Sequence, residues 1–305
     1  MVLRQPISGK THAMQRVVHL FDQLPFGRQW RQSMCGAIPL VEDRKKGAVV
    51  HRSELFDVSD EIVLVTGGGT GLGLAMAQAL ALNGAGVALA GNDRASLEAA
   101  VDKIVALGGK AIRVALDVRS DSSISQAFDQ VETELGPVSV LVNNAGVAHR
   151  DKATQLTRER LREVMAVNVD GAYMVAQETA RRMIRDSRGG SIINVSSVLS
   201  AIPMRQVSAY SASKAAISQI TRSLALEWAR HGIRVNEIRP GWFETDLTAP
   251  FLKGPGAGVM AGQNPMGRLG EAHDLDGAVL LLASKASAFM TGSSLDIDGG
   301  HSVGR

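Results

Sequence analysis

Two side chains that could move a proton stand four residues apart in this 305-residue chain, Tyr210 and Lys214. Residues four apart on a helix share one face, so the lysine amine could approach the tyrosine ring. A free phenol has a pKa of about 10, and lowering it by about 3 units with a nearby ammonium requires roughly 4 kcal/mol. The spacing therefore predicts a general acid/base for an alcohol or carbonyl oxygen. The alternative is a buried tyrosine beside a lysine that extends to solvent.

A pair of serines strengthens this prediction. Ser196 and Ser197 directly follow a predicted strand, and Ser197 lies thirteen residues before Tyr210. A serine hydroxyl beside the tyrosine could donate a hydrogen bond to a substrate oxygen and stabilise the charge that develops there. With a serine in this place, an accidental tyrosine–lysine pair becomes the weaker explanation.

Glycines crowd the turn between the first predicted strand and the first predicted helix. Glycine lets a backbone turn sharply and approach a pyrophosphate closely, while the following helix presents free N–H groups and its positive dipole end. The turn therefore predicts a dinucleotide-binding site, with a plain strand-to-helix turn as the alternative. Its residues are Thr66, Gly67, Gly68, Gly69, Thr70, Gly71, Leu72 and Gly73.

Apolar strand-like runs alternate with helix-like stretches from Ser53 onward. Buried strands joined by helices of ten or more residues make βαβ units and a parallel sheet. The pattern predicts an α/β fold, a Rossmann-type doubly wound seven-stranded parallel sheet in one domain over residues 53–305. The predicted strands are Ile62–Val65, Val87–Ala90, Ala111–Leu116, Val138–Val142, Ile192–Val195, Arg234–Ile238 and Ser294–Ile297. The predicted helices are Leu72–Leu80, Arg94–Leu107, Ser122–Leu135, Arg158–Val169, Gly171–Asp186, Ala209–Arg230 and Ala272–Ala283.

In this order the motifs resemble those of the short-chain dehydrogenase/reductase family in its single-domain form. The resemblance runs from the first strand through Gly300 and leaves residues 1–52 outside. It implies an NAD- or NADP-dependent oxidoreductase that moves a hydride between nicotinamide and a secondary alcohol or ketone, without a metal. The matching segments are T-G-x-x-x-G-x-G from Thr66 to Gly73, Asn143-Asn144-Ala145-Gly146, Asn168, Ser197 with Tyr210-x-x-x-Lys214, Pro240-Gly241 with Thr245, and Asp298-Gly299-Gly300.

The resemblance also implies a catalytic group. Tyr210 would be the acid/base, assisted by Lys214, and the family spacing selects Ser197 rather than Ser196 as the donor to the substrate oxygen. Asn168 resembles the family residue that holds a water in a proton relay to the lysine. An asparagine that binds helix backbone at a kink is the structural alternative, and it is compatible with that role.

The cofactor contacts implied by the resemblance lie at the carboxyl ends of the strands. Asn143 is expected to shape the backbone there, and Thr245 either holds the nicotinamide carboxamide or caps a following helix with Asp246. Asp117 resembles the residue at the adenine, with a strand-end turn as its alternative. The implied contacts are Thr66, Gly67, Gly69, Thr70, Gly71, Leu72, Gly73, Asn92, Asp93, Arg94, Asp117, Val118, Asn144, Ala145, Gly146, Tyr210, Lys214, Pro240, Gly241, Phe243 and Thr245.

The end of the second strand decides between NAD and NADP in the family. Gly91 stands where an acid would select NAD, and Asn92 stands where NADP-using relatives often carry arginine. Thr70 is not the basic residue common in NADP-using forms. Without the acid a 2′-phosphate meets no repulsion and Arg94 could reach it, whereas Asp93 could instead turn toward the ribose. These residues favour NADP slightly and leave NAD open.

The substrate is limited to a ketone or a secondary alcohol. The second half of the chain resembles 3-oxoacyl-carrier-protein reductases and gluconate- or sugar-type dehydrogenases, which implies a 3-oxoacyl or a sugar/polyol-type carbonyl compound. The glycine- and proline-rich stretch Thr245–Gly267 is predicted to be a mobile loop over the site. Arg205 and Arg268 could meet an acidic group, and His149 either lines the substrate pocket or is an exposed loop residue.

Residues 1–52 differ from the rest in charge. They hold nine basic and three acidic side chains, a net +6, whereas residues 53–305 carry −3. A short amphipathic helix is predicted over Met14–Leu24. We interpret the segment as a flexible or loosely docked extension, such as an upstream start codon would add, with an organelle-targeting sequence or an oligomer-contacting arm as alternatives. Its charge is weak evidence for nucleic-acid binding.

Composition excludes several classes of protein. The single cysteine, Cys35, allows no internal disulfide and no cysteine-based zinc site. The apolar runs are shorter than the roughly 18 residues of a membrane span. We expect a cytoplasmic enzyme with a small-molecule substrate and no metal, membrane or nucleic-acid partner, and the resemblance implies a homotetramer or homodimer. The apolar residues of the helix that bears Tyr210 suit either a subunit interface or an internal core. The alternative to an enzyme is a catalytically silent dinucleotide-binding regulatory protein.

Overall fold

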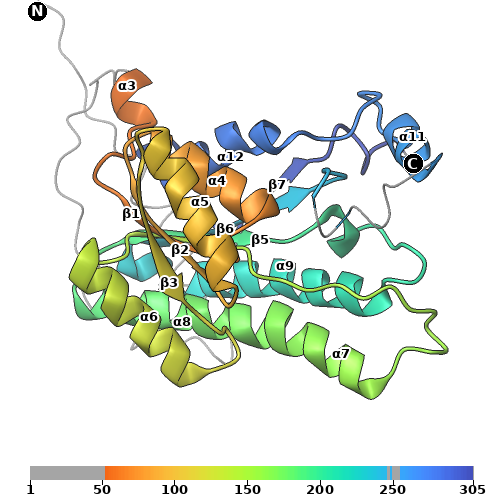
Figure 1. The fold of residues 1–305 in the computed structure, drawn as a ribbon, viewed down its shortest axis with the longest axis horizontal. Helices are drawn as coiled ribbons and strands as arrows, with labels where there is room; N and C mark the ends of the chain where they lie inside the picture. Colours follow the sequence, from red (N-terminus) through yellow and green to blue (C-terminus); the bar gives the residue numbers. More distant parts are fainter. Residues whose placement is uncertain (1–51, 246–247, 249–254, 305) are drawn as a thin grey trace, which may run out of the picture. The chain divides into compact units, whose positions relative to one another are not determined.

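A seven-stranded parallel sheet organises the protein. The structure is a computed structural model that describes residues 52–245, 248 and 255–304, all within the compact unit Val50–Arg305. The strand order is β3-β2-β1-β4-β5-β6-β7 (Figure 1). Successive strands are therefore added on one side of β1 up to β3 and on its other side from β4 onward. This confirms the predicted doubly wound α/β fold. The strands are β1 (Ile62–Thr66), β2 (Gly86–Gly91), β3 (Lys110–Ala115), β4 (Val140–Asn143), β5 (Gly190–Val195), β6 (Ile233–Pro240) and β7 (Ser294–Ile297).

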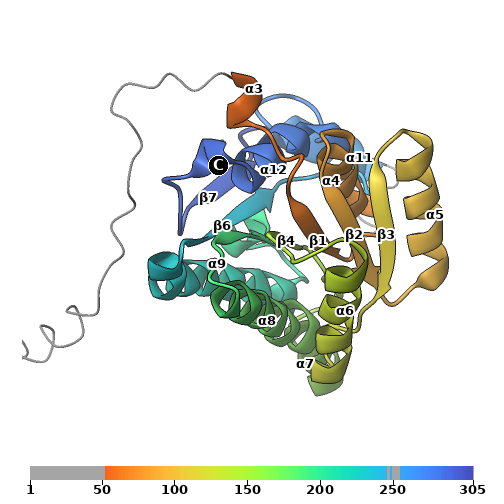
Figure 2. The same cartoon turned by 90° about the vertical axis from the view of Figure 1, so that its left-hand side faces the viewer.

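Helices cover both faces of the sheet (Figure 2). The first face packs on α4, α5 and α12, and the second on α6, α8 and α9. Alternate residues of each strand enter the two cores because successive side chains point to opposite faces: Val63 and Val65 enter the first core, and Leu64 enters the second. The principal helices are α3 (Arg52–Leu55), α4 (Gly71–Leu82), α5 (Arg94–Ala106), α6 (Asp121–Glu134), α7 (Arg158–Met165), α8 (Ala172–Arg185), α9 (Ser208–Trp228), α11 (Pro255–Gln263) and α12 (Asp276–Ala283).

The helix that precedes β5 carries an inserted π-helical segment. Two separate helices were predicted, but α7 runs through the π-helix η1 (Ala166–Gly171) directly into α8. Such π-bulges occur frequently at functional sites. Here the segment contains Asn168, which is 1% exposed. The wider turn therefore carries one of the residues that sequence reasoning singled out.

The predicted loop Thr245–Gly267 is wrong in part, because α11 occupies Pro255–Gln263. Its glycines obscured the helical pattern, since glycine has a low helix propensity. The predicted helix Met14–Leu24 lies outside the described residues. Within the part of the chain that the structure covers, no helix is long and apolar enough to span a membrane.

Thr66 joins the two halves of the sheet at the reversal of strand order. Its hydroxyl oxygen accepts hydrogen bonds of 2.9 Å from the backbone N–H groups of both Asn144 and Ala145, just beyond β4. The Asn144 side chain returns two bonds of 3.1 Å, to the carbonyls of Thr66 and Gly67. Thr66 is completely buried, so no water can replace these contacts. The turn after β1 is thereby fixed to the loop after β4.

We expect Thr66→Val to destabilise the fold by about 2 kcal/mol or more, because two backbone donors lose their acceptor at nearly constant volume. Thr179→Val is the matched control, since the Thr179 hydroxyl is also buried but only donates to the Val175 carbonyl within α8. Its cost should stay below about 1 kcal/mol. Urea unfolding of the three proteins measures both values. Equal losses in the two variants would contradict this role of Thr66.

Candidate active site

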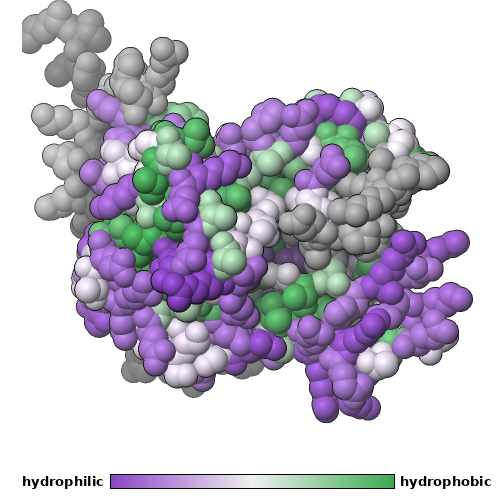
Figure 3. All heavy atoms as spheres, in the orientation of Figure 1, coloured by the Kyte–Doolittle hydropathy of each residue, from purple (hydrophilic) through white to green (hydrophobic). Residues whose placement is uncertain are grey.

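A cavity of about 260 Å³ opens at the carboxyl ends of the central strands. Hydrophilic side chains cover neighbouring α7 at the lower right of Figure 3. Of the residues predicted from the sequence, the cavity wall contains Gly67, Thr70, Gly71, Leu72, Asn144, Ala145, Gly146, Ser197, Tyr210, Lys214, Pro240, Gly241, Phe243 and Thr245. Residues that were also predicted but lie outside this wall are Thr66, Gly69, Gly73, Asn92, Asp93, Arg94, Asp117, Val118 and Asn168.

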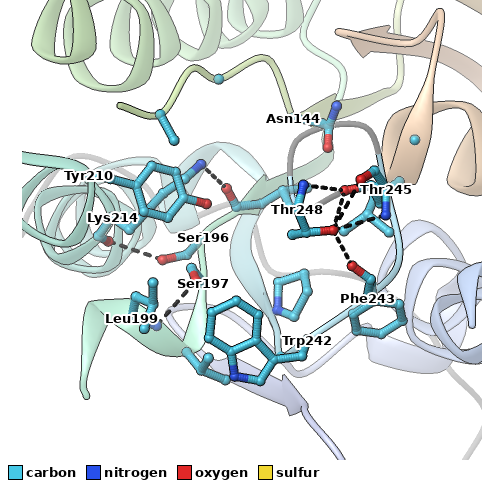
Figure 4. Close-up of a pocket in the computed structure, with 18 of the residues that line it drawn as sticks. Asn144, Ser196, Ser197, Leu199, Tyr210, Lys214, Trp242, Phe243, Thr245 and Thr248 are labelled. Carbon is cyan, nitrogen blue, oxygen red and sulfur yellow. Dashed lines mark hydrogen bonds between the residues drawn. The ribbon is translucent and has the colours of Figure 1, made fainter. Parts of the chain in front are cut away.

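Tyr210 and Lys214 lie on one face of α9, at its amino-terminal end (Figure 4). The Lys214 Nζ is 5.6 Å from the centre of the Tyr210 ring and donates a 2.8 Å hydrogen bond to the Val195 carbonyl at the end of β5. Lys214 is only 4% exposed. The strand end therefore holds the amine beside the phenol, as the four-residue spacing predicted.

Burial dominates the protonation of both groups. It raises the pKa of Tyr210 to about 12, opposed by a hydrogen bond with the Ser197 side chain. It lowers the pKa of Lys214 to about 8, opposed by the Glu237 carboxylate. Sequence reasoning expected the amine to lower the pKa of the phenol, but the loss of hydration on burial outweighs that attraction. The two groups therefore need further positive charge in the site before the phenol ionises near neutral pH.

The two neighbouring serines point to different partners. The Ser197 Oγ accepts a 3.1 Å bond from the Leu199 backbone N–H and also hydrogen-bonds with Tyr210. The Ser196 hydroxyl donates to the Lys214 backbone carbonyl at 3.0 Å, and it lies 3.4 Å from the Ser218 hydroxyl. Ser197 is thus beside the phenol, and Ser196 attaches the strand end to α9.

Asn168 bridges the loop after β4 and α9. Its side-chain oxygen accepts from the Val147 backbone N–H at 2.8 Å, and its amide donates to the Val147 carbonyl at 2.9 Å and to the Ser213 hydroxyl at 3.0 Å. A Cβ on Gly146 would lie 3.3 Å from this oxygen and 3.5 Å from the Lys214 Nζ. Asn168 and the amine therefore converge on Gly146, whose lack of a side chain leaves room between them.

The glycine-rich turn forms a close-fitting cradle. Gly67 and Gly71 have positive φ angles of 62° and 54°, which side chains other than glycine rarely adopt. A Cβ on Gly73 would lie 2.2 Å from the Gly67 carbonyl oxygen, so α4 packs directly on the turn. The free N–H groups at the start of α4 face the cavity, where they suit a pyrophosphate.

Thr245 lies across the cavity from Tyr210 (Figure 4). Its backbone N–H donates to the Thr248 hydroxyl at 2.9 Å, and the Thr248 backbone N–H donates back to the Thr245 hydroxyl at 3.3 Å. A Cβ on Gly71 would lie 3.6 Å from the Thr245 Cβ. This reciprocal pair therefore closes the cavity next to the glycine-rich turn.

The ends of β2 and β3 are occupied by local interactions. Asp93 caps α5 by accepting from the Ala95 and Ser96 backbone N–H groups at 3.1 and 3.4 Å and from the Ser96 hydroxyl. Arg94 pairs with Glu98 at 2.8 Å and remains largely exposed. The Asp93 carboxylate thus already has donors within α5, and its contact with a ribose stays a prediction.

The segment after β3 also holds a carboxylate that is engaged in local hydrogen bonds. Asp117 accepts two side-chain bonds from Arg119, at 2.9 and 2.7 Å, and these lower its pKa. The Val118 side chain is buried against Gly171. Only the backbone of Val118 can thus face a bound nucleotide.

The basic residues considered for the substrate are mostly engaged elsewhere. His149 pairs with Glu163 at 2.8 Å, and Arg268 binds both oxygens of Asp274 at 2.6 and 2.8 Å. Arg205 is exposed and lies outside the cavity wall. Among the residues with defined positions, no group of three His, Cys, Asp or Glu could hold a metal ion.

Sequence reasoning missed most of the apolar part of the wall. Leu199, Met204 and Val207 lie between Ser197 and Tyr210 in the chain and line the cavity. That segment connects the two catalytic candidates, a signal that could have identified it. Trp242 also lines the cavity, and its indole N–H lies 3.4 Å from the His301 Nε2, its hydrogen-bond acceptor. The wall beside Ser197 is therefore mainly apolar.

Known proteins are similar to this chain over most of its length. A family model described as enoyl-(acyl carrier protein) reductase matches residues 67–302. Gluconate 5-dehydrogenase of Gluconobacter oxydans is 35% identical over 251 residues, which cover 82% of this chain and 98% of that protein. Galactitol 2-dehydrogenase (L-tagatose-forming) of Cereibacter sphaeroides is 37% identical over 253 residues, with coverage of 82% and 98%.

A solved structure is also similar throughout the sheet. Gluconate 5-dehydrogenase from Burkholderia cenocepacia J2315, in complex with NADP and tartrate, is 33% identical and has a TM-score of 0.79. The match covers 82% of this chain and 98% of that one. These similarities establish the family and an oxidoreductase chemistry.

We expect the free energy of unfolding of the wild type to rise by roughly 3 kcal/mol between pH 8 and pH 10.5, and that of Lys214→Met to stay level over the same range. Burial depresses the pKa of this amine from 10.5 to about 8, so the folded protein binds fewer protons than the unfolded chain between these values. Stability therefore rises with pH across that window in the wild type and not in the variant, which has no amine to titrate at this position. Chemical unfolding between pH 7 and pH 10.5 measures it.

The exposed lysine Lys103 on α5 offers the control, because Lys103→Met removes the same charge from water. Its stability should follow the wild type at every pH. An equal rise of stability with pH in Lys214→Met and in the wild type would show that the Lys214 amine is not its cause.

Proposed function

The chain belongs to the short-chain dehydrogenase/reductase family, and from that membership we propose that it transfers a hydride between an NAD(P) nicotinamide and a secondary alcohol or ketone. The observation that carries this proposal is that buried Ser197 and Lys214 meet half-buried Tyr210 beside the glycine-rich turn, in one cavity. The nicotinamide, when bound, supplies or accepts the hydride. The protein contributes binding, orientation and proton transfer.

Tyr210 exchanges the proton with the substrate oxygen. In reduction its hydroxyl protonates the oxygen as the carbonyl carbon gains the hydride, and in oxidation its phenolate removes the hydroxyl proton. The Lys214 ammonium favours the phenolate, and the Ser197 hydroxyl donates to the substrate oxygen. Asn168 positions the loop of Val147 and keeps a polar group near the amine, which suits a water-mediated proton path.

The cofactor lies along the carboxyl ends of the strands in this proposal. The pyrophosphate rests on the turn Thr66–Gly73 and the start of α4, where the backbone fits closely and the N–H groups are free. The nicotinamide half lies between Gly146, Pro240 and Thr245, next to Tyr210. The adenosine half reaches Asn92, Arg94 and Asp117.

NADP is the favoured cofactor. The Asp93 carboxylate is already engaged as the cap of α5, so no free acid stands at the end of β2 to hold ribose hydroxyls. The exposed Arg94 offers a positive charge at this point. The NADP in the similar Burkholderia cenocepacia structure supports the same choice, and NAD is the alternative.

The substrate in this proposal is a sugar- or polyol-type carbonyl compound, with a 3-oxoacyl compound as the second candidate. The names of the two related dehydrogenases support the first, and the apolar wall of Leu199, Met204 and Trp242 favours the second. A catalytically silent regulatory protein is the alternative from another class. The intact Ser197–Tyr210 contact argues against it.

We also propose a cytoplasmic homotetramer. Ile217 and Leu224 of α9 are buried in the protein's own core, so the face of α9 that they form is internal. Other apolar side chains are exposed on α8 and α9, with Ile184 at 38% and Leu226 at 84%. These suit contact with further copies of the chain.

Tyr210→Phe should lose at least about a thousandfold in kcat, because the proton donor is gone while the ring is kept. NADPH binding, followed by fluorescence, should stay within about twofold, since the substitution leaves the glycine-rich turn intact. Tyr173→Phe is the natural control, as Tyr173 is the only other tyrosine in the sequence. Assays on sugar-type and 3-oxoacyl ketones measure turnover. Undiminished turnover in Tyr210→Phe would exclude Tyr210 as the acid/base.

Arg94→Ala should weaken NADPH binding about fivefold and leave NADH binding unchanged, because only the former has a 2′-phosphate to pair with the guanidinium. Arg113→Ala is the matched control: Arg113 also pairs with Glu98, at 3.2 Å, but it emerges from within β3. Titration of both cofactors against both variants measures the effect. An equal loss for NADH and NADPH would refute this role of Arg94.

A further inference from the structure

Strand β6 carries three charged side chains, Arg234, Glu237 and Arg239, of which the last two lie toward its carboxyl end (Figure 1 locates the strand). Alternate residues of a strand share a face, so both lie on the face of Ile233 and Val235, which α9 covers. Glu237 is completely buried. A buried carboxylate is costly unless another group compensates its charge, so its partners need to be identified.

The partners of Glu237 within the sheet compensate its charge only in part, because Arg239 is shared between two carboxylates. Arg239 binds Asp296 on β7 through two contacts of 2.6 and 2.9 Å, whereas its Nε is 3.8 Å from the nearer Glu237 oxygen. The Ser294 hydroxyl donates to Oε1 at 2.5 Å. Among the described residues, Oε2 is buried without a hydrogen-bond donor. The group of Glu237, Arg239 and Asp296 therefore keeps one net negative charge.

The buried cation on this side of the sheet is Lys214. Glu237 pairs in register with Asn194 on β5, one residue before Val195, whose carbonyl binds the Lys214 Nζ. The Asn194 side chain contacts Thr221 of α9, which shows that this row of side chains faces the helix that bears Lys214. The Tyr210 ring lies beside the amine, and the negative charge of Glu237 raises the pKa of Lys214 against the effect of burial.

We propose that Glu237 is a positioning residue for the reaction, the buried countercharge that keeps the Lys214 amine protonated while it supports the Tyr210 phenolate. The proposal rests on the proposed function of the Tyr210–Lys214 pair. Glu237 does not touch the substrate. It acts through Lys214: without its charge the amine gives up its proton more readily, and the phenolate then loses its neighbouring cation.

The test measures the amine directly, without turnover. The rate of reductive methylation of Lys214 by formaldehyde and a borane reductant is followed by peptide mass spectrometry from pH 6 to pH 10, because only the neutral amine reacts. In Glu237→Gln the midpoint of labelling should move to lower pH by roughly one unit relative to the wild type. Glu227→Gln removes an exposed carboxylate from α9, the helix that bears Lys214, and should leave the midpoint unchanged. An unchanged midpoint in Glu237→Gln overturns the proposal.

A second variant separates charge from shape. Glu237→Asp keeps the carboxylate and should restore most of the wild-type midpoint of labelling. If the midpoint depended on the shape of the glutamate side chain and not on its charge, Glu237→Asp would not restore it. In the oxidative direction, Glu237→Gln should lower kcat about tenfold with little change in KM, since substrate contacts are intact. If the midpoint shifts but neither the wild type nor any variant turns over a substrate, the proposed function fails. The effect of the Glu237 charge on the Lys214 amine is then still supported.

Discussion

The packing of ionisable groups at the amino-terminal end of α9, where burial shifts their pKa values, is the constraint on which the site depends. A phenol and an amine are both held where hydration is lost, and each is thereby driven toward its neutral form, with the pKa of Tyr210 raised to about 12 and that of Lys214 lowered to about 8. A neutral phenol is cheap to bury and can donate a proton, but the oxidative direction needs the phenolate, which burial disfavours. The surrounding charges therefore decide the chemistry. A cation in the cavity favours the phenolate, and a buried anion behind it, Glu237, favours the ammonium.

The same constraint explains the packing around the cavity. Charged and polar groups near Tyr210 are satisfied by the ends of strands rather than by solvent: Val195 holds the amine, and Thr66 holds the loop after β4. The reversal of strand order between β1 and β4 leaves a crevice at the carboxyl ends of these strands, and the polar groups line it. The glycines of the first turn let α4 approach this crevice closely enough to present its free N–H groups.

Competition for hydrogen bonds limits what a motif can predict. Asp93 and Asp117 were both assigned to the nucleotide from their positions at strand ends. In the folded chain Asp93 caps α5 and Asp117 binds Arg119, so each carboxylate already has donors. Sequence reasoning can place an acid at a strand end, but only the folded chain shows which helix start or arginine competes with a nucleotide for its oxygens.

The sequence by itself determined the sheet, the glycine-rich turn and the trio Ser197, Tyr210 and Lys214. The sheet follows from the periodicity of apolar residues, and the turn and the trio follow from the spacing of residues along the chain. It obscured α11, whose glycines mask helical periodicity. Tertiary structure alone decided the rest: the contact of Thr66 with the loop after β4, the apolar wall next to Ser197, and the position of Glu237 on the face covered by α9. These depend on strand register and on helices brought together from distant parts of the chain, and local patterns carry no information about either.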